Sequence, residues 1–134
     1  MKQRKKDDAH IPVFVVQEHH ARNLHWDFRL EIDGVLKSWA VPKEPPLEPG
    51  VKRIAVAVPD HELSYADFQG EIPEGQYGAG EVKRWDKGTY KMISEHKSKM
   101  VFELKGKKMK GEYVLLKFAK AGEKDWLLFK KQEE

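Results

Sequence analysis

Two histidines and an aspartate, His19, His25 and Asp27, lie within nine residues of one another. Apolar and polar residues alternate strictly from Leu24 to Glu31, which predicts a half-buried strand with successive side chains on opposite faces. His25 and Asp27 therefore share a face. His19, at the end of a preceding strand, is close enough in sequence to fold back against them. Two imidazoles and a carboxylate leave positions open for water or substrate, as a catalytic divalent metal requires.

The donor types indicate which metals this set suits. A nitrogen-rich set with one hard oxygen suits Mn, Fe, Zn, Co or Ni and argues against Ca or Mg alone. The chain has no cysteine, which excludes a disulfide framework and a Cys-type zinc site. The alternative is a polar strand face with ordinary surface histidines, and the spacing alone leaves both interpretations open.

Arg29 is the next residue on the polar face of the same strand. A guanidinium beside a metal suits a phosphate or carboxylate, because it donates two parallel hydrogen bonds and stays charged. The alternative is a surface ion pair with Glu31 or Asp33.

Five residues farther along the chain are weaker candidates. We expect His61 in a loop after a strand, where it has the pKa range of a general acid or is an ordinary exposed histidine. Tyr65 and Tyr77 are candidate hydroxyl donors or packing aromatics. Lys43 and Arg53 flank a proline-rich loop and could meet an anion, although two loop cations are common on any surface.

A hairpin must position the polar stripe, which is the polar face of this strand formed by His25, Asp27, Arg29 and Glu31. Asp33-Gly34 is a two-residue hairpin signal between alternating runs. An ideal hairpin at this point places Arg29 opposite Ser38 and Asp27 opposite Ala40. These small partners would leave space in front of the stripe.

Short β-type runs separated by glycine and proline fill the rest of the chain. They predict an all-β, mostly antiparallel fold with little helix: a closed or nearly closed barrel of about eight strands, or a sandwich. A helical turn is expected only within Met92–Met100. Further strands are expected at Val13–Val16 leading into Gln17 and His19, and at Val35–Val41, Arg53–Val58 (closed by Pro59), Glu81–Trp85, Thr89–Ile93, Met100–Leu104, Glu112–Phe118 and Trp126–Lys130.

The length and charge of the chain limit the kinds of protein that it can be. Its 134 residues suit one domain, which we expect at 13–134 after a charged, flexible arm at 1–12. Charged residues make up 35%, but the net charge is only +3, which allows a local basic patch without demanding a nucleic-acid partner. No apolar run approaches the roughly 18 residues of a membrane span and no signal peptide is evident, so we expect a soluble, cytoplasmic monomer.

Two long motifs then point to a known family. HHARNLHWDFRLEIDGVLKSWAVPK and DHELSYADFQGEIPEGQYGAGEVKRWDKGTY resemble the 3′-phosphoesterase domain of bacterial DNA ligase D and its stand-alone bacterial and archaeal homologues. The resemblance runs from about Phe14 to Lys131. It implies a compact β-barrel with a crescent-shaped active site. It also implies a manganese-dependent enzyme, with Co²⁺ or another divalent transition metal as a substitute, that removes 3′-terminal ribonucleotides and then 3′-phosphates to leave a 3′-OH.

The resemblance also implies roles for individual residues. The metal ligands fall on His19, His25 and Asp27. Arg29 and His61 match phosphate-contacting and catalytic positions, and the remaining matches are Gln17 and Tyr65 as supporting polar residues and Lys43 and Arg53 as accessory basic ones.

The chain departs from the family pattern near its N-terminus. Family members in multidomain ligases carry an N-terminal segment with an Arg-Asp pair and an acidic residue that complete the site. We cannot align that segment with the dozen residues before Val13, which leaves the diesterase step open. We expect a stand-alone version whose substrates are DNA or RNA–DNA primer–template 3′ ends and whose ligase and polymerase are separate partners.

Two other functions fit parts of the sequence. A non-catalytic nucleic-acid-binding barrel would need exposed aromatics and a continuous basic groove. Trp26 and Trp39 count against it, because they fall on the face opposite the polar stripe and we expect them in the core. A cupin-like metal oxygenase would use the same ligands with Fe²⁺, but Arg29, His61 and the basic loop residues suit a phosphate better.

Overall fold

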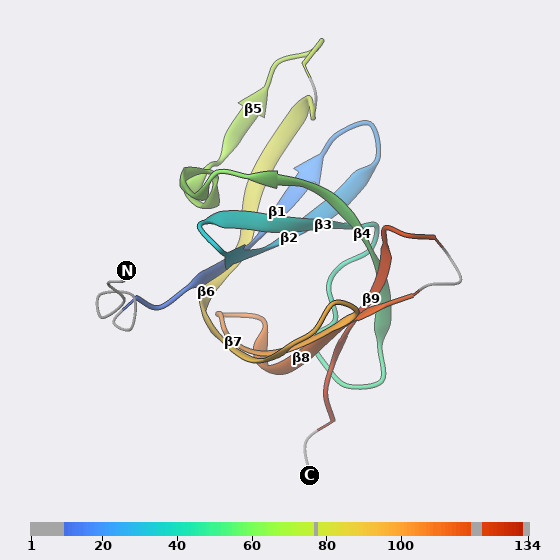
Figure 1. Ribbon diagram of the computed structural model, residues 1–134. Helices are drawn as coiled ribbons and strands as arrows, with labels where there is room; N and C mark the ends of the chain where they lie inside the picture. Colours follow the sequence, from blue (N-terminus) through green and yellow to red (C-terminus); the bar gives the residue numbers. More distant parts are fainter. Residues whose placement is uncertain (1–9, 77, 119–121, 133–134) are drawn as a thin grey trace.

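The computed structural model describes residues 10–76, 78–118 and 122–132. Of the predicted N-terminal arm, residues 1–9 lie outside the described residues, as does Tyr77. The described chain forms nine strands and one short 3₁₀ helix (Figure 1). They are β1 (Val13–His20), β2 (Leu24–Ile32), β3 (Val35–Val41), β4 (Lys52–His61), η1 (Leu63–Asp67), β5 (Gly70–Ile72), β6 (Gly80–Glu95), β7 (Lys99–Lys105), β8 (Lys110–Lys117) and β9 (Asp125–Lys130).

Eight of these strands close into an antiparallel barrel. Their order is β1-β2-β3-β4-β9-β8-β7-β6, and pairing of β1 with β6 completes the ring. Strand β5 pairs only with β6 and stands outside the ring. The prediction of a closed, all-β, antiparallel barrel of about eight strands is therefore confirmed.

The hairpin between β2 and β3 has the predicted register. Arg29 lies opposite Ser38, and Asp27 lies opposite Ala40. Asp33 and Gly34 both have positive φ angles, 52° and 83°, as a two-residue hairpin turn of this type requires.

The barrel interior holds the core on the face of β2 opposite the polar stripe. Phe28 and Leu30 are fully buried, and Trp39 packs with them, as predicted. Trp26 is half-buried against the same core. Leu24 begins the alternating run, whose apolar residues we expected to face the core, but it is 44% exposed. It is the first residue of β2.

The segment from the end of β4 through η1 and β5 lies over the outer face of β1–β3, in the upper part of Figure 1. Ala66 of η1 is buried against Val15 and Leu36, which point outward from the barrel, and Tyr65 packs beside them. A second, smaller apolar cluster thus holds this covering segment in place. The hollow that it forms with the barrel contains the polar stripe.

Three predicted boundaries are wrong. Strand β4 does not stop at Pro59 but continues to His61, which is therefore the last strand residue rather than a loop residue. The register shifts between Leu36 and Ser38, and this bulge accommodates a proline that has no amide hydrogen. The two strands expected between Glu81 and Ile93 are one, β6. No helical turn forms between Met92 and Met100, because β6 runs to Glu95 and β7 begins at Lys99.

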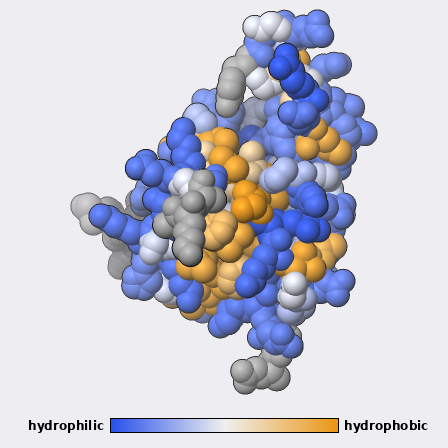
Figure 2. All heavy atoms as spheres, turned by 90° about the vertical axis from the view of Figure 1, so that its right-hand side faces the viewer, coloured by the Kyte–Doolittle hydropathy of each residue, from blue (hydrophilic) through white to orange (hydrophobic). Residues whose placement is uncertain are grey.

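Apolar side chains also gather on the outside of the barrel, on the face over β4 and β9 in Figure 2. Ile54, Leu127 and Leu116 are neighbours in register across β4, β9 and β8. Leu116 is 37% exposed. In the part of the chain that the structure describes, no helix has the length and apolar character needed to cross a membrane.

Candidate metal and phosphate site

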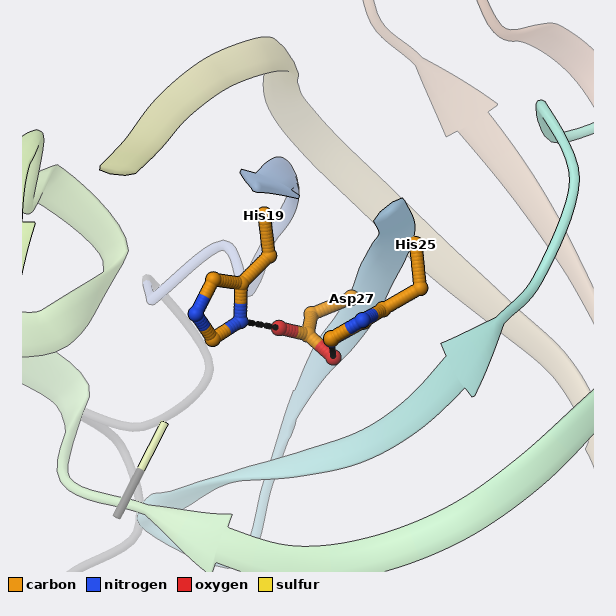
Figure 3. Close-up of side chains that lie close together, drawn as sticks. All are labelled: His19, His25 and Asp27. Carbon is orange, nitrogen blue, oxygen red and sulfur yellow. Dashed lines mark hydrogen bonds and ion pairs between the residues drawn. The ribbon is translucent and has the colours of Figure 1, made fainter. Parts of the chain in front are cut away.

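His19, His25 and Asp27 converge on one point of the outer barrel surface (Figure 3). The turn after β1 brings His19 directly opposite His25 in the register of β1 and β2. One nitrogen from each imidazole and one carboxylate oxygen all lie within 4.8 Å of one another. His19 and Asp27 are buried, and His25 is half-buried.

Backbone carbonyls fix the tautomer of both imidazoles. His19 donates its Nε2–H to the Gly78 carbonyl at 2.7 Å, and His25 donates its Nδ1–H to the Asn23 carbonyl at 3.0 Å. Nδ1 of His19 and Nε2 of His25 then face the two carboxylate oxygens of Asp27, each at 3.3 Å. A neutral imidazole presents a lone pair there, so each nitrogen needs a cation, either a proton or a metal, between it and the carboxylate.

This donor set fits a divalent transition metal. Two ligands about 2.1 Å from one ion, at octahedral or tetrahedral angles, lie about 3.0–3.4 Å apart. Each imidazole nitrogen lies 3.3 Å from one of the two carboxylate oxygens, and the three donor groups as a whole lie within 4.8 Å of one another. Metal-binding histidines usually donate the other ring N–H to a carbonyl or carboxylate, as both do here. The residues present could therefore hold the metal that the family resemblance implies.

Electrostatics keep Asp27 ionised. Burial alone would raise its pKa, but hydrogen bonding to His19 and His25 and the charge of Arg29 outweigh burial and hold the pKa well below its usual range. The hydrogen bond to Asp27 is also the main reason that the pKa of His25 is raised, with burial opposing it. The site thus has a permanent negative charge with two nitrogen donors beside it.

Arg29 is almost completely buried next to the carboxylate. Its Nε donates to Gln17 Oε1 at 2.6 Å and its Nη1 to Ser38 Oγ at 2.7 Å, and its Nη2 lies 3.4 Å from Asp27 Oδ2. The guanidinium also lies over the Tyr65 ring, 4.9 Å from its centroid. These contacts fix the plane of the guanidinium at the edge of the hollow.

His61 and Tyr65 form the opposite wall. Their rings stack with centroids 4.1 Å apart, and Phe68 continues the stack 5.0 Å beyond Tyr65. Burial, followed by the charge of Arg29, lowers the pKa of His61 below 6.5. Burial raises the pKa of Tyr65, so its hydroxyl keeps its proton.

A hollow of about 300 Å³ joins these groups. Ala40 and Val58 form small apolar parts of its wall, so the space predicted in front of the stripe is present. Six of the predicted site residues line it: His19, His25, Asp27, Arg29, His61 and Tyr65.

Three predicted residues lie elsewhere. Gln17 is fully buried behind Arg29, where its amide donates to the Tyr65 carbonyl at 2.8 Å and to the Phe68 carbonyl at 3.3 Å. Lys43 and Arg53 line a separate hollow of about 200 Å³ near the start of β4. Nε of Arg53 donates to the Glu44 carbonyl at 2.8 Å.

Sequence reasoning missed the backbone carbonyls of Gly78 and Asn23 and the hydroxyl of Ser38. Gly78 has a φ of +77°, and a Cβ there would lie 3.4 Å from the His19 ring. The cluster of glycines before β6 was a usable signal for such a close approach. Ser38 was recognised only as a small neighbour, since a hydroxyl partner for Arg29 has no sequence signature.

Comparison with known proteins places the chain in a family. The family model described as the DNA ligase D 3′-phosphoesterase domain matches residues 17–117, which include every residue that lines the hollow. The Pseudomonas aeruginosa multifunctional non-homologous end joining protein LigD is 46% identical over 96% of this chain and 16% of its own length.

Two mycobacterial proteins are similarly related. The Mycobacterium tuberculosis multifunctional non-homologous end joining DNA repair protein LigD is 49% identical over 78% of this chain and 14% of its own length. Its Mycolicibacterium smegmatis counterpart is 39% identical over 90% of this chain and 17% of its own length. The chain spans about one sixth of the length of these relatives, and it belongs to the DNA ligase D 3′-phosphoesterase domain family.

Proposed function

We propose that the protein is a metal-dependent 3′-end-healing phosphoesterase acting on DNA or RNA–DNA primer–templates. The two activities proposed are removal of a 3′-terminal ribonucleotide and removal of a 3′-phosphate, leaving a 3′-OH for repair synthesis or ligation. The observation that carries the proposal is the pair of imidazoles whose tautomers are fixed so that both lone pairs face Asp27, with Arg29 beside them.

His19, His25 and Asp27 would hold Mn²⁺, with Co²⁺ or another divalent transition metal as a substitute. Bound there, the metal would offset negative charge on a phosphate oxygen. Side chains of the protein would bind and orient the phosphate and supply the proton. The Arg29 guanidinium orients the phosphate next to the carboxylate and offsets charge that builds up in the transition state.

In the proposed hydrolysis a water attacks the phosphorus as its bond to the leaving oxygen breaks, and His61 is the proposed proton donor to that leaving oxygen. In the free protein its lowered pKa leaves the ring neutral near pH 7. A phosphate in the hollow would favour the protonated form, so that the proton arrives with the substrate. Tyr65 stacks on His61 and keeps its ring plane fixed, and its protonated hydroxyl can donate to a phosphate oxygen.

Lys43 and Arg53 are proposed contacts for the substrate beyond its terminal phosphate. Lys43 follows Ala40, a residue in the wall of the hollow, by only three residues, just beyond the end of β3. Gln17 would act through Arg29, because its side chain is fully buried. The ligase and polymerase that use the product would be partners of the reaction.

The proposal is tested with a primer–template carrying a 3′-phosphate or a single 3′-ribonucleotide, with Mn²⁺ and with chelator. His25→Ala is expected to abolish both products, while the control His20→Ala, at the end of β1 and paired with Glu18, keeps them. Full activity of His25→Ala, or of the wild type in chelator, would refute the metal assignment. DNA binding by the wild type without any product would favour a non-catalytic binding barrel.

A further inference from the structure

A second hollow lies on the other side of η1 from the candidate site. Its volume is about 710 Å³, larger than that of the first. η1 contributes Tyr65 to the first hollow and Asp67 to the second. The remaining wall of the second hollow comes from Val13 at the start of β1, from β6 and from the turn between β7 and β8.

Cations dominate this hollow. Arg84 and Lys87 reach it from β6, and Lys107 and Lys108 reach it from the turn. Two more lysines, Lys105 and Lys110, flank the turn, and no acidic residue lies between them. Since the net charge of the chain is only +3, this grouping is a local concentration of positive charge rather than a general property of the surface.

The two acidic residues of the hollow do not cancel this charge. The Asp86 carboxylate is buried and accepts backbone N–H bonds from Lys87, Lys107, Lys108 and Met109 at 2.8–3.1 Å. Asp67 is 70% exposed and pairs with both Arg84 and Lys87. Two carboxylates, of which only Asp67 is exposed, therefore face four cations, and the hollow has a net positive charge.

The turn that carries the lysines is held rigidly. Three of the four Asp86 contacts are with turn residues, and a Cβ on Gly106 would lie 2.5 Å from both Asp86 and Phe14. Nζ of Lys108 lies over the Trp85 ring, 4.4 Å from its centroid. Because this backbone is already ordered, an anion that binds here costs less conformational entropy than one that orders a free loop.

We propose that this hollow binds the sugar–phosphate backbone of the nucleic acid whose 3′ end occupies the candidate site. The choice of nucleic acid rests on the proposed function. The two hollows adjoin, because both border β1 and η1: His19 and Tyr65 line the first, and Val13 and Asp67 line the second. Lys108 covers the face of the Trp85 ring, so no base can stack there, and the hollow would bind the nucleic acid through its phosphates.

The test compares two double variants that lose the same charge. Lys107→Gln with Lys108→Gln changes the hollow, while Lys97→Gln with Lys99→Gln changes the exposed turn between β6 and β7. Fluorescence anisotropy measures binding of a labelled primer–template with an ordinary 3′-OH end, so that no reaction is needed. Thermal melts check that both variants fold.

The first variant is expected to bind the duplex about tenfold more weakly at low salt. The slope of log K against log salt should fall in magnitude by about 1.8, which corresponds to two lost phosphate contacts. The second variant should match the wild type. Equal affinities and slopes for the two variants would overturn the proposal. The lysine-rich turn between β7 and β8 would then be better explained as a binding surface for an acidic protein.

A hydrolysis assay separates this proposal from the proposed function. A nucleoside 3′-phosphate has no backbone phosphate other than the one in the candidate site, so the first variant should cleave it at the wild-type rate. If the wild type cleaves no 3′-phosphate, the proposed function fails while the binding comparison still decides the second hollow. If cleavage is normal and both variants bind alike, only the second hollow is disproved.

Discussion

At the scale of single residues, the role of Arg29 depends both on its guanidinium and on the side chains around it. The guanidinium contacts Gln17, Ser38 and Asp27 and lies over the Tyr65 ring. A lysine carries the same charge but has a single ammonium and cannot reproduce this planar set of contacts.

Arg29→Lys is therefore expected to lower kcat/KM for a 3′-phosphate by about 10- to 100-fold, equivalent to the loss of a charge-assisted hydrogen bond of about 1.5–3 kcal/mol. Mn²⁺ affinity, measured by isothermal titration calorimetry, should stay close to that of the wild type, because the three ligands are intact. Wild-type kcat/KM in this variant would contradict a phosphate role for Arg29.

The protonation of His61 gives a second prediction. Burial and the charge of Arg29 place its pKa below 6.5, so its NMR titration midpoint should lie below 6.5 in the free protein. The unfolded chain takes up this proton first, so the His61 contribution to folding stability decreases as the pH falls through about 6.5. Adding inorganic phosphate with the metal should raise the midpoint. A midpoint at or above 6.5 in the free protein, or no response to phosphate, would count against the proposed proton donor, with His61→Asn used to assign the signal.

At the scale of elements, one side chain connects the barrel to its cover. Gln17 on β1 accepts from Arg29 on β2 and donates to the carbonyls of Tyr65 and Phe68. The guanidinium and the aromatic wall of the hollow are thus held by the same buried amide. This contact couples two parts of the site that the sequence separates by dozens of residues.

Gln17→Leu preserves most of the volume but leaves Arg29 Nε and the Tyr65 carbonyl without this partner. We expect the free energy of unfolding to fall by about 2–4 kcal/mol, as measured by urea denaturation, with a large loss of kcat and little change in Mn²⁺ affinity. Val16→Ala is a control that destabilises the core without touching the site. If both variants lose activity only in proportion to stability, Gln17 has no positioning role.

The elements also show how far sequence reasoning reaches. The polar stripe and the β2–β3 hairpin were predictable, because strict alternation and an Asp-Gly turn determine face and register. The continuity of β6 was not, since Asp86, Lys87 and Gly88 read as a turn, whereas Asp86 is in fact a buried acceptor for the neighbouring turn. η1 and β5 were missed because five- and three-residue elements carry no periodicity.

At the scale of the whole molecule, the site is built on the outside of a closed barrel. The first two strands provide the metal ligands and Arg29, the covering segment provides His61 and Tyr65, and the loop between β5 and β6 provides the Gly78 carbonyl. A ligand that binds the three convergent side chains binds only the folded chain, so it should stabilise the fold by mass action.

Mn²⁺ at 100 times its dissociation constant is accordingly expected to stabilise the protein by about 2.7 kcal/mol, seen as a higher Tm. Asp27→Asn should lose this increase, because an amide is a weak ligand for the metal. Without metal the same variant should be less stable than the wild type at neutral pH, and the difference should disappear in acid. This follows because the lowered pKa of Asp27 gives stability above its unfolded value of about 3.9 that is lost as the pH falls. An equal Tm increase in both proteins would place the metal elsewhere.

The central claim is that one metal and one phosphate bind side by side on the polar stripe of β2. A crystal structure of the protein soaked with Mn²⁺ and inorganic phosphate tests it most directly. We predict one ion about 2.0–2.3 Å from His19 Nδ1, His25 Nε2 and an Asp27 oxygen, and a phosphate within hydrogen-bond distance of Arg29. An ion held by other residues, or a phosphate away from Arg29, would contradict the account.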